Sequence, residues 1–286
     1  MAVVVDGSRR LSSRPARAAN LARNQAAQDG RAERWRPARD ALWSLLDRHV
    51  APGAAVAVVG AGNAHDLPLT RLLARAGSVD LIDLSTGPSR RALKREPPAL
   101  RARGRALRAD VTNGVADAIV TAVRRGRVPR PVEAPRGPIG GGRYDVMVGD
   151  LFYSQLLYPA LLDAGLSPHR TRAALDAYGQ GLCDAVVARM HASAEVVVHV
   201  HDRLGWWDGN APSAPLEAFI SGEASLADEP GPRGCDIDGA LARCGQRAIH
   251  RALWRWPFAE NVDYLVEAVV AVSVLAVTET GARARA

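Results

Sequence analysis

The chain has 286 residues, of which 48% are hydrophobic and 5% aromatic, and its formal net charge is +7 at pH 7. This length and apolar content suffice for a sizeable core and exclude a fibrous or wholly disordered protein. The three cysteines include no CxxC pair. A disulfide framework and a structural zinc site are therefore not expected, and we predict no metal.

Neither end of the chain predicts export or membrane insertion. The valine run within residues 1–10 is too short for the apolar region of a signal peptide. Residues 266–277 are apolar but contain Glu267, and they fall short of the roughly 20 residues that span a bilayer. We therefore expect a soluble, cytoplasmic protein without a membrane partner.

The positive charge comes mostly from arginine, which is dense in residues 9–39, 90–108 and 124–136. A basic patch can bind phosphates. However, no aromatic RNP-type strand, KH loop or zinc knuckle accompanies these arginines. We therefore favour a solvated basic surface over a nucleic-acid partner.

In chain order, the first predicted element is helical and lies within residues 17–48. Apolar residues recur at Trp35, Ala38 and Leu42, and Pro37 is placed to begin a helix. We expect residues 1–48 to form an N-terminal helical arm, or lid. One α/β domain should follow over residues 49–286.

A strand and a glycine turn come next. Residues 55–59, AVAVV, form a short β-branched run that suits a strand buried on both faces of a parallel sheet. Gly60 and Gly62 then allow the backbone to turn sharply and a ligand to approach its amides closely. This arrangement is typical of a site for a nucleotide-type cofactor.

A helix and a second strand complete the unit. Residues 67–76 predict a helix with Asp66 available as its cap, and residues 79–82 predict a strand. Asp83 lies 21 positions beyond Gly62. An acidic residue at a spacing of about 20 accepts hydrogen bonds from a ribose diol. We therefore expect one βαβ unit to contact two parts of a ligand.

The third glycine of the dinucleotide fingerprint is missing, because Ala64 and His65 stand where that pattern would continue. The strand, G-x-G turn, polar loop and helix instead resemble the class I S-adenosylmethionine-dependent methyltransferases, and Asp83 matches that family's acidic second motif. The resemblance implies S-adenosylmethionine as cofactor. The implied contacts in this unit are Gly60, Ala61, Gly62, Asn63, Asp66, Asp83 and Leu84.

Two later segments extend the resemblance. The sequence LRADV matches the place where the family puts an Asp and an apolar residue near the adenine, which assigns Asp110 and Val111 to that ring. On local grounds alone Asp110 could equally cap the segment that begins at Val111. The sequence YDVMVGDL matches the fourth strand and implies that Asp150 and Leu151 lie beside the cofactor.

The remaining strands agree with the same family. Residues 195–200 predict a fifth strand, and residues 253–257 and 264–274 predict the antiparallel hairpin that closes the fold. The resemblance implies a Rossmann-like α/β fold with a seven-stranded, mostly parallel sheet, an antiparallel C-terminal strand and an N-terminal helical extension. In similar small-molecule enzymes such an extension folds over the cofactor and forms part of a substrate lid.

Candidate catalytic residues follow the fourth and fifth strands, at the sheet edge where open α/β sheets bind ligands. His201 is a candidate general base because histidine titrates near neutral pH, and Tyr153 is a second candidate. Strand alternation places His199 and His201 on one face. The substrate-binding candidates are Trp35, Phe152, Tyr158 and Trp206. Each candidate could instead have only a packing role.

The implied reaction is direct displacement, in which a substrate nucleophile attacks the methyl carbon of the sulfonium and S-adenosylhomocysteine leaves. We predict a methyltransferase for a small molecule, an aromatic or indole-containing specialised metabolite that is methylated on carbon, nitrogen or oxygen. The alternatives are an RNA or protein methyltransferase, an NAD-dependent oxidoreductase, and a non-catalytic cofactor-binding scaffold. The arm and the last strand could pack within one chain or across a homodimer.

Overall fold

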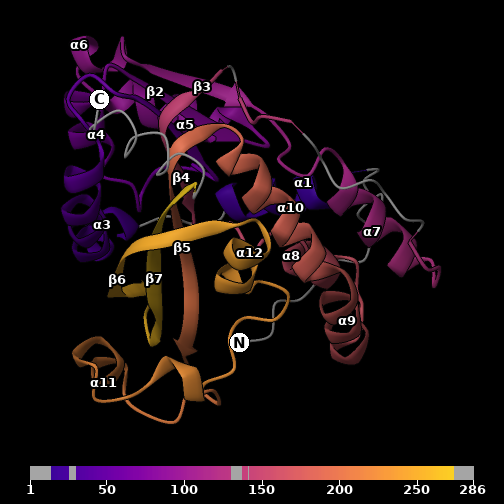
Figure 1. Ribbon diagram of the computed structural model, residues 1–286. Coiled ribbons are helices and arrows are strands. Elements are labelled where there is room, and N and C mark those ends of the chain that lie inside the picture. Colours follow the sequence, from indigo (N-terminus) through magenta and orange to yellow (C-terminus); the bar gives the residue numbers. More distant parts are fainter. Residues whose placement is uncertain (1–13, 26–29, 130–136, 141, 274–286) are drawn as a thin grey trace, which may run out of the picture.

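The computed structural model describes residues 14–25, 30–129, 137–140 and 142–273. At its centre lies a seven-stranded sheet in the order β3-β2-β1-β4-β5-β7-β6 (Figure 1). The strands are β1 Ala55–Val59, β2 Ser78–Asp83, β3 Gly104–Arg108, β4 Tyr144–Asp150, β5 Ala194–Trp206, β6 Gln246–Ala259 and β7 Val262–Ser273.

The strand directions confirm the predicted sheet. Strand β1 pairs in parallel with β2 and β4, while β3 and β5 extend the parallel part on either side. Strand β7 is antiparallel to both β5 and β6. The predicted hairpin is present with longer strands than expected, and residue 274, its expected last residue, lies outside the described residues.

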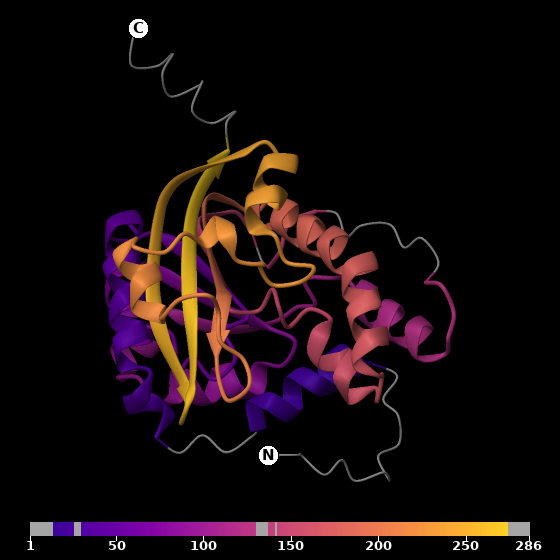
Figure 2. The same ribbon diagram turned by 90° about the horizontal axis from the view of Figure 1, so that it is seen from below.

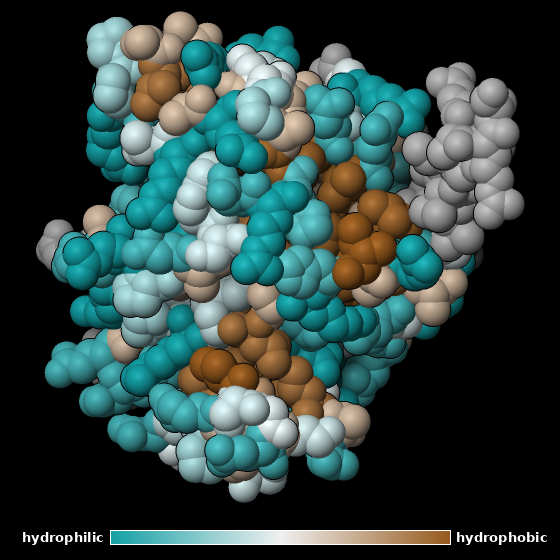
Figure 3. All heavy atoms as spheres, turned by 60° about the vertical axis from the view of Figure 1, so that its left-hand side comes forward, coloured by the Kyte–Doolittle hydropathy of each residue, from teal (hydrophilic) through white to brown (hydrophobic). Residues whose placement is uncertain are grey.

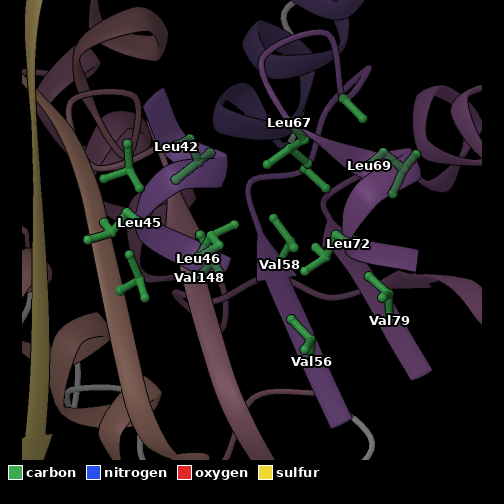
Figure 4. Packing of buried hydrophobic residues seen from close by; sticks show 14 of the residues in the cluster. Leu42, Leu45, Leu46, Val56, Val58, Leu67, Leu69, Leu72, Val79 and Val148 are labelled. Carbon is green, nitrogen blue, oxygen red and sulfur yellow. The ribbon is translucent and has the colours of Figure 1, made fainter. Parts of the chain in front are cut away.

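Helices cover both faces of the sheet, which explains why its central strands are continuous apolar runs. One face packs on α3 (Arg36–His49), α4 (Leu69–Arg75) and α5 (Thr86–Arg95), and Figure 4 shows leucines of α3 and α4 beside valines of the sheet. The other face packs on α10 (Gln180–His191) and α12 (Ile237–Arg243). Side chains of β1 alternate between these two layers, Val58 on the first and Ala57 on the second.

The shorter helices and turns lie around this core. They are α1 Pro15–Gln25, α2 Arg31–Arg34, α6 Pro98–Arg101, α7 Val115–Arg124, α8 Tyr158–Asp163, α9 Pro168–Ala174, η1 Leu175–Gly179, α11 Leu216–Ser221 and η2 Leu226–Asp228. None of the helices in the described part of the chain has the length and apolar character needed to cross a bilayer.

The N-terminal arm is divided into several helices within its described residues. Helix α1 packs on α7 and α8 (Figure 2), where the amide of Ala16 donates to Asp117 Oδ1 at 2.8 Å. Gly30, with a φ of 71°, precedes α2, and Trp35 separates α2 from α3. Pro37 lies in the first turn of α3, as predicted. The arm therefore reaches two distant parts of the domain.

The prediction that Asp66 caps helix α4 is wrong. The helix begins at Leu69, after Pro68 with a ψ of 54°, and no side chain caps it. Asp66 is three positions before the first helical residue, too far to bond its first free amides, and it faces a cavity instead.

The outer edges of the sheet are β3 and β6. Along β6, Arg247, Arg251 and Arg255 are exposed, and Pro257 follows them near the end of the strand. The side of the molecule that carries α3 and β6 is mostly hydrophilic, with apolar groups confined to patches (Figure 3). Part of the positive charge of the chain is thus displayed along this edge.

Candidate active site

A cavity of about 390 Å³ lies at the carboxyl ends of β1, β2, β4 and β5, where open α/β sheets bind ligands. Residues of the N-terminal arm and of the β6–β7 hairpin complete its wall. All the predicted cofactor-binding residues line it: Gly60, Ala61, Gly62, Asn63, Asp66, Asp83, Leu84, Asp110, Val111, Asp150 and Leu151. The fold thus brings together residues from four separate segments of the sequence.

The turn after β1 requires glycine at position 60. Gly60 has a φ of 81°, and a Cβ placed there would lie 2.7 Å from Phe152 Cβ and 2.8 Å from the carbonyl oxygen of Asp150. Gly62 also has a positive φ, of 44°. Gly60 therefore allows the β1 turn to pack directly against the end of β4.

Asp83 is held at the end of β2 by backbone amides. Its Oδ2 accepts a hydrogen bond from the amide of Gly62 at 3.0 Å, and its Oδ1 accepts one from Ser85 at 3.2 Å. Burial raises the pKa of Asp83, while these amides oppose the shift. A carboxylate has about four acceptor sites, so Asp83 can also accept bonds from a ligand in the cavity.

Asp110 organises the turn between β3 and α7. Its Oδ1 accepts hydrogen bonds from the amide of Thr112 at 2.8 Å and its hydroxyl at 2.7 Å, and Oδ2 accepts from the amide of Gly114 at 2.7 Å. The predicted alternative, a cap of a segment that begins at Val111, is wrong: α7 begins at Val115 without a side-chain cap, and Asp110 instead holds the turn before it. Asp110 lines the cavity as well, beside Val111.

Asp66 and Asp150 form an acidic pair in the cavity wall. Asp150 is only 3% exposed, and neither of its carboxylate oxygens has a hydrogen-bond partner among the described residues. Burial, and then the nearby Asp66, raise the pKa of Asp150 well above its ordinary value. Burial also raises the pKa of Asp66 to about 6. A buried carboxylate without a partner is costly, so a ligand with positive charge or donors would stabilise this pair.

The backbone next to this pair is strained. Leu151 has a φ of 49°, in the left-handed region that a branched side chain rarely adopts. Two hydrogen bonds hold it there: its amide donates to Val200 at 3.0 Å, and its carbonyl accepts from Gln155 Nε2 at 2.7 Å. Such strain is common at ligand sites.

Four aromatic rings form a second part of the wall, and we call Trp35, Trp256, Phe258 and Tyr264 the aromatic wall. The ring centroid of Trp256 lies 5.0 Å from those of Trp35 and Phe258 and 5.9 Å from that of Tyr264. The indole nitrogen of Trp35 donates to the carbonyl of Phe258 at 3.2 Å. This bond joins the N-terminal arm to the C-terminal hairpin.

Asp202 on β5 also lines the cavity, and its Oδ1 accepts a hydrogen bond from the hydroxyl of Ser154 at 2.9 Å. Burial raises the pKa of Asp202. The sequence analysis did not select Asp202, Ser154, Trp256, Phe258 or Tyr264. The available signal was their position beyond or beside predicted strand ends.

The two predicted catalytic residues lie outside the cavity lining. Tyr153 is buried, with its hydroxyl 2.6 Å from Nδ1 of His199. His201 is 1% exposed, its Nε2 lies 3.5 Å from Glu267, and burial lowers its pKa to about 3. Because side chains alternate along β5, Asp202 faces the cavity and His201 faces away from it. The structure thus places neither residue where it could take a proton from a ligand.

The predicted substrate residues divide in the same way. Trp35 and Phe152 line the cavity. Tyr158 is 47% exposed and lies outside the lining. Trp206 also lies outside it, because its indole nitrogen bonds the carbonyl of Ala214 at 3.3 Å. Among the described residues, no group of three or more His, Cys, Asp or Glu side chains is arranged to hold a metal ion.

No protein-family model matches the chain, and no curated protein sequence matches it. Similar solved structures include a magnesium protoporphyrin IX methyltransferase from Synechocystis with bound S-adenosylhomocysteine, at 12% identity over 94% of this chain and 90% of that one, with a TM-score of 0.42. A SAM-dependent methyltransferase from Aquifex aeolicus is 11% identical over 90% of this chain and 98% of that one, with a TM-score of 0.41.

A protein from Pyrococcus horikoshii, described as a candidate RNA methyltransferase, is 15% identical over 83% of this chain and 84% of its own, with a TM-score of 0.43. At these identities and TM-scores the likeness is one of fold. The function of the chain has to be argued from its own residues.

Proposed function

We propose that this protein is an S-adenosylmethionine-dependent methyltransferase that acts on a small molecule. The observation that carries the proposal is the composition of one cavity. A glycine turn, Asp83 and an aromatic wall line it, together with the carboxylate of Asp150, which has no hydrogen-bond partner in the described part of the chain. A ribose, a cationic group and an apolar acceptor each have matching residues in this cavity.

The residues present fit the cofactor. Asp83 would accept hydrogen bonds from the ribose hydroxyls, and Asp110 and Val111 would contact the adenine. The buried oxygens of Asp150, which have no hydrogen-bond partner among the described residues, would gain a positively charged partner beside Asp66. When bound, the cofactor supplies a methyl group on a positively charged sulfur, which is a good leaving group.

The protein would contribute mainly by positioning the acceptor and excluding water. Trp35 of the arm is fixed over the hairpin by its bond to the carbonyl of Phe258. This contact supports the predicted lid role of the N-terminal arm. The aromatic wall supports an aromatic or indole-containing acceptor, since such rings pack well against one another.

An RNA or protein methyltransferase is the second candidate, and the net charge of +7 with its exposed arginines favours it. The cavity itself argues for a small molecule. Five aspartates line the cavity, against two arginines, Arg23 and Arg31. With two arginines, this wall offers few charged donors to a phosphate group. Salt-sensitive binding of tRNA would favour the second candidate.

The test is isothermal titration of S-adenosylmethionine, S-adenosylhomocysteine and NAD against the wild type and Asp83→Ala. We expect micromolar binding of both adenosyl ligands and at least tenfold weaker binding by the variant, about 1.4 kcal/mol. Asp208→Ala, at an exposed aspartate beyond β5, is the matched control and should bind like the wild type. Binding of NAD alone, or of no ligand, would contradict the proposal.

A further inference from the structure

We infer that the methyl acceptor is an amine on an aromatic body, and that Asp202 and the aromatic wall bind it together. The inference rests on the proposed methyltransferase function and narrows its acceptor from carbon, nitrogen or oxygen to nitrogen. It concerns the part of the cavity that Trp35, Trp256, Phe258 and Tyr264 line.

The first support is the charge of the cavity. The chain as a whole is basic, with a net charge of +7, yet aspartates outnumber arginines in the cavity wall. Of these aspartates, Asp83 and Asp110 already accept backbone hydrogen bonds. Asp150 is buried without any partner among the described residues. The wall therefore has more acidic groups than cationic ones, and a cationic ligand would favour their ionised form.

The second support is the position of Asp202. Ser154 bonds only its Oδ1, and no described side chain is hydrogen-bonded to Oδ2. The carboxylate is therefore fixed in orientation by one oxygen and can accept a bond from a ligand with the other. An ammonium group is the ligand group that matches a half-buried carboxylate best, because it supplies both charge and donors.

The third support is that Asp202 and the aromatic wall form one subsite. Tyr264 and Trp256 are directly opposite each other across β7 and β6, and the register of β5 against β7 shifts between Asp202 and Leu204. Asp202 is paired with Val266 of β7, and Tyr264 lies two residues from Val266 on the same face, so both side chains are on one side of the sheet and both line the cavity. A single small molecule can therefore contact both.

Aromatic faces attract cations, most strongly when water is excluded. The structure already contains one such pair, since Cζ of Arg31 lies 5.3 Å from the ring centroid of Trp35, and both residues line the cavity. The wall can thus hold the flat body of an acceptor by packing and its amine by charge. A phenol or alcohol would gain the packing only.

In the methyl transfer, each proton and electron pair has an acceptor. Asp202 Oδ2 accepts a proton from the ammonium, which frees the lone pair on nitrogen. That lone pair forms the new carbon–nitrogen bond while the carbon–sulfur bond breaks and its electron pair stays on sulfur. The second proton on nitrogen passes to water after transfer. Asp202 is assigned this role because it lies on the same face of the β5–β7 pair as Tyr264 and its Oδ2 has no described side-chain partner.

The test compares two probes that differ in one group, tryptamine and indole-3-ethanol. Each is titrated calorimetrically into the wild type and Asp202→Asn, with and without saturating S-adenosylhomocysteine. We expect the wild type to bind tryptamine at least tenfold tighter than indole-3-ethanol. Asp202→Asn should lose that preference but keep its affinity for S-adenosylhomocysteine within twofold.

Two further variants keep the result interpretable. Asp208→Asn removes an exposed charge beyond β5 and should keep the full preference. Ser154→Ala removes the bond that orients Asp202 and should reduce the preference several-fold, even if Asp202→Asn does not fold.

Equal binding of the two probes by the wild type, or no binding of either, would overturn the inference. A preference that survives in both Asp202→Asn and Ser154→Ala would overturn it too. In each case, intact binding of S-adenosylhomocysteine would leave the proposed methyltransferase function standing. Loss of that binding in the wild type would instead contradict the proposed function.

Discussion

The two parts of the cavity are built in different ways. At the cofactor part, backbone amides and glycines do most of the positioning, and the bond from Gly62 to Asp83 spans 21 positions of one βαβ unit. At the acceptor part, side chains form the wall, and the bond from Trp35 to Phe258 spans 223 positions. The first depends on a local turn, whereas the second exists only when the arm and the hairpin are both docked.

This difference has a functional consequence. A site made by backbone geometry keeps its shape when surrounding side chains change, so it suits an invariant ligand. A wall made by side chains from two distant segments can be altered without changing the turn. We therefore expect substitutions to separate cofactor binding from acceptor binding.

The largest effect is expected at Gly60. Gly60→Ala would impose both a left-handed backbone and a clash with the end of β4, and we expect it to lower the free energy of unfolding by about 3 kcal/mol. Gly53→Ala is the control, because Gly53 has the same φ of 81° but open space around its Cβ position. It should cost only about 1 kcal/mol. Equal losses in urea denaturation would show that close packing at the turn is unimportant.

A smaller and opposite effect is expected at Asp66. Its pKa of about 6 exceeds the ordinary 3.8, so the folded protein binds more protons than the unfolded chain between those values. Wild-type stability should therefore rise as the pH falls from 7 to 4. Asp66→Asn should stabilise the ligand-free protein at pH 7 by on the order of 2 kcal/mol, and the gain should vanish below pH 4.

Thermal unfolding at several pH values would measure this difference in stability. Asp208→Asn is the control, and its stability should equal that of the wild type. The Asp66→Asn variant should bind S-adenosylmethionine more weakly, because it lacks the negative charge. A stability gain that persists at pH 3.5 would mean that the charge of Asp66 is not its cause.

The smallest effect is expected at Trp35, and it tests the acceptor part alone. Trp35→Phe keeps a ring but removes the bond to the carbonyl of Phe258, at a cost of about 1 kcal/mol of stability. Tryptamine should bind about fivefold more weakly, while S-adenosylhomocysteine binding stays within twofold. Trp43→Phe, at a half-buried site in α3, is the control. A parallel loss of both ligands would show that the two parts are not separable.

The cofactor part of the cavity could be predicted from the sequence more completely than the acceptor part. Gly60, Gly62 and Asp83 were predicted because a short segment fixes their relation, and the sheet with its antiparallel hairpin was predicted from the order of such segments. Asp150 was predicted to lie beside the cofactor from its position at the end of the fourth strand, and it lines the cavity.

The acceptor part could be predicted only in fragments. Alternation along β5 was recognised, but which of its two faces meets the cavity depends on the whole sheet, so His201 was selected and its neighbour Asp202 was not. Trp256 and Tyr264 were not predicted, because their contact depends on the register of the β6–β7 hairpin. Trp35 was recognised as a candidate without its partner Phe258, since nothing local connects two residues so far apart.

The arginines along β6 have a consequence for the behaviour of the protein at high concentration. An edge strand presents unpaired backbone groups that can recruit another strand and nucleate aggregates. Pro257 would offer no amide to such a pairing. Copies that approach edge to edge would bring the exposed Arg247 of each chain together, while Arg251 and Arg255 are ion-paired with Asp238 and Asp263. If the protein forms a dimer, this edge is therefore the part of its surface least suited to joining the two subunits.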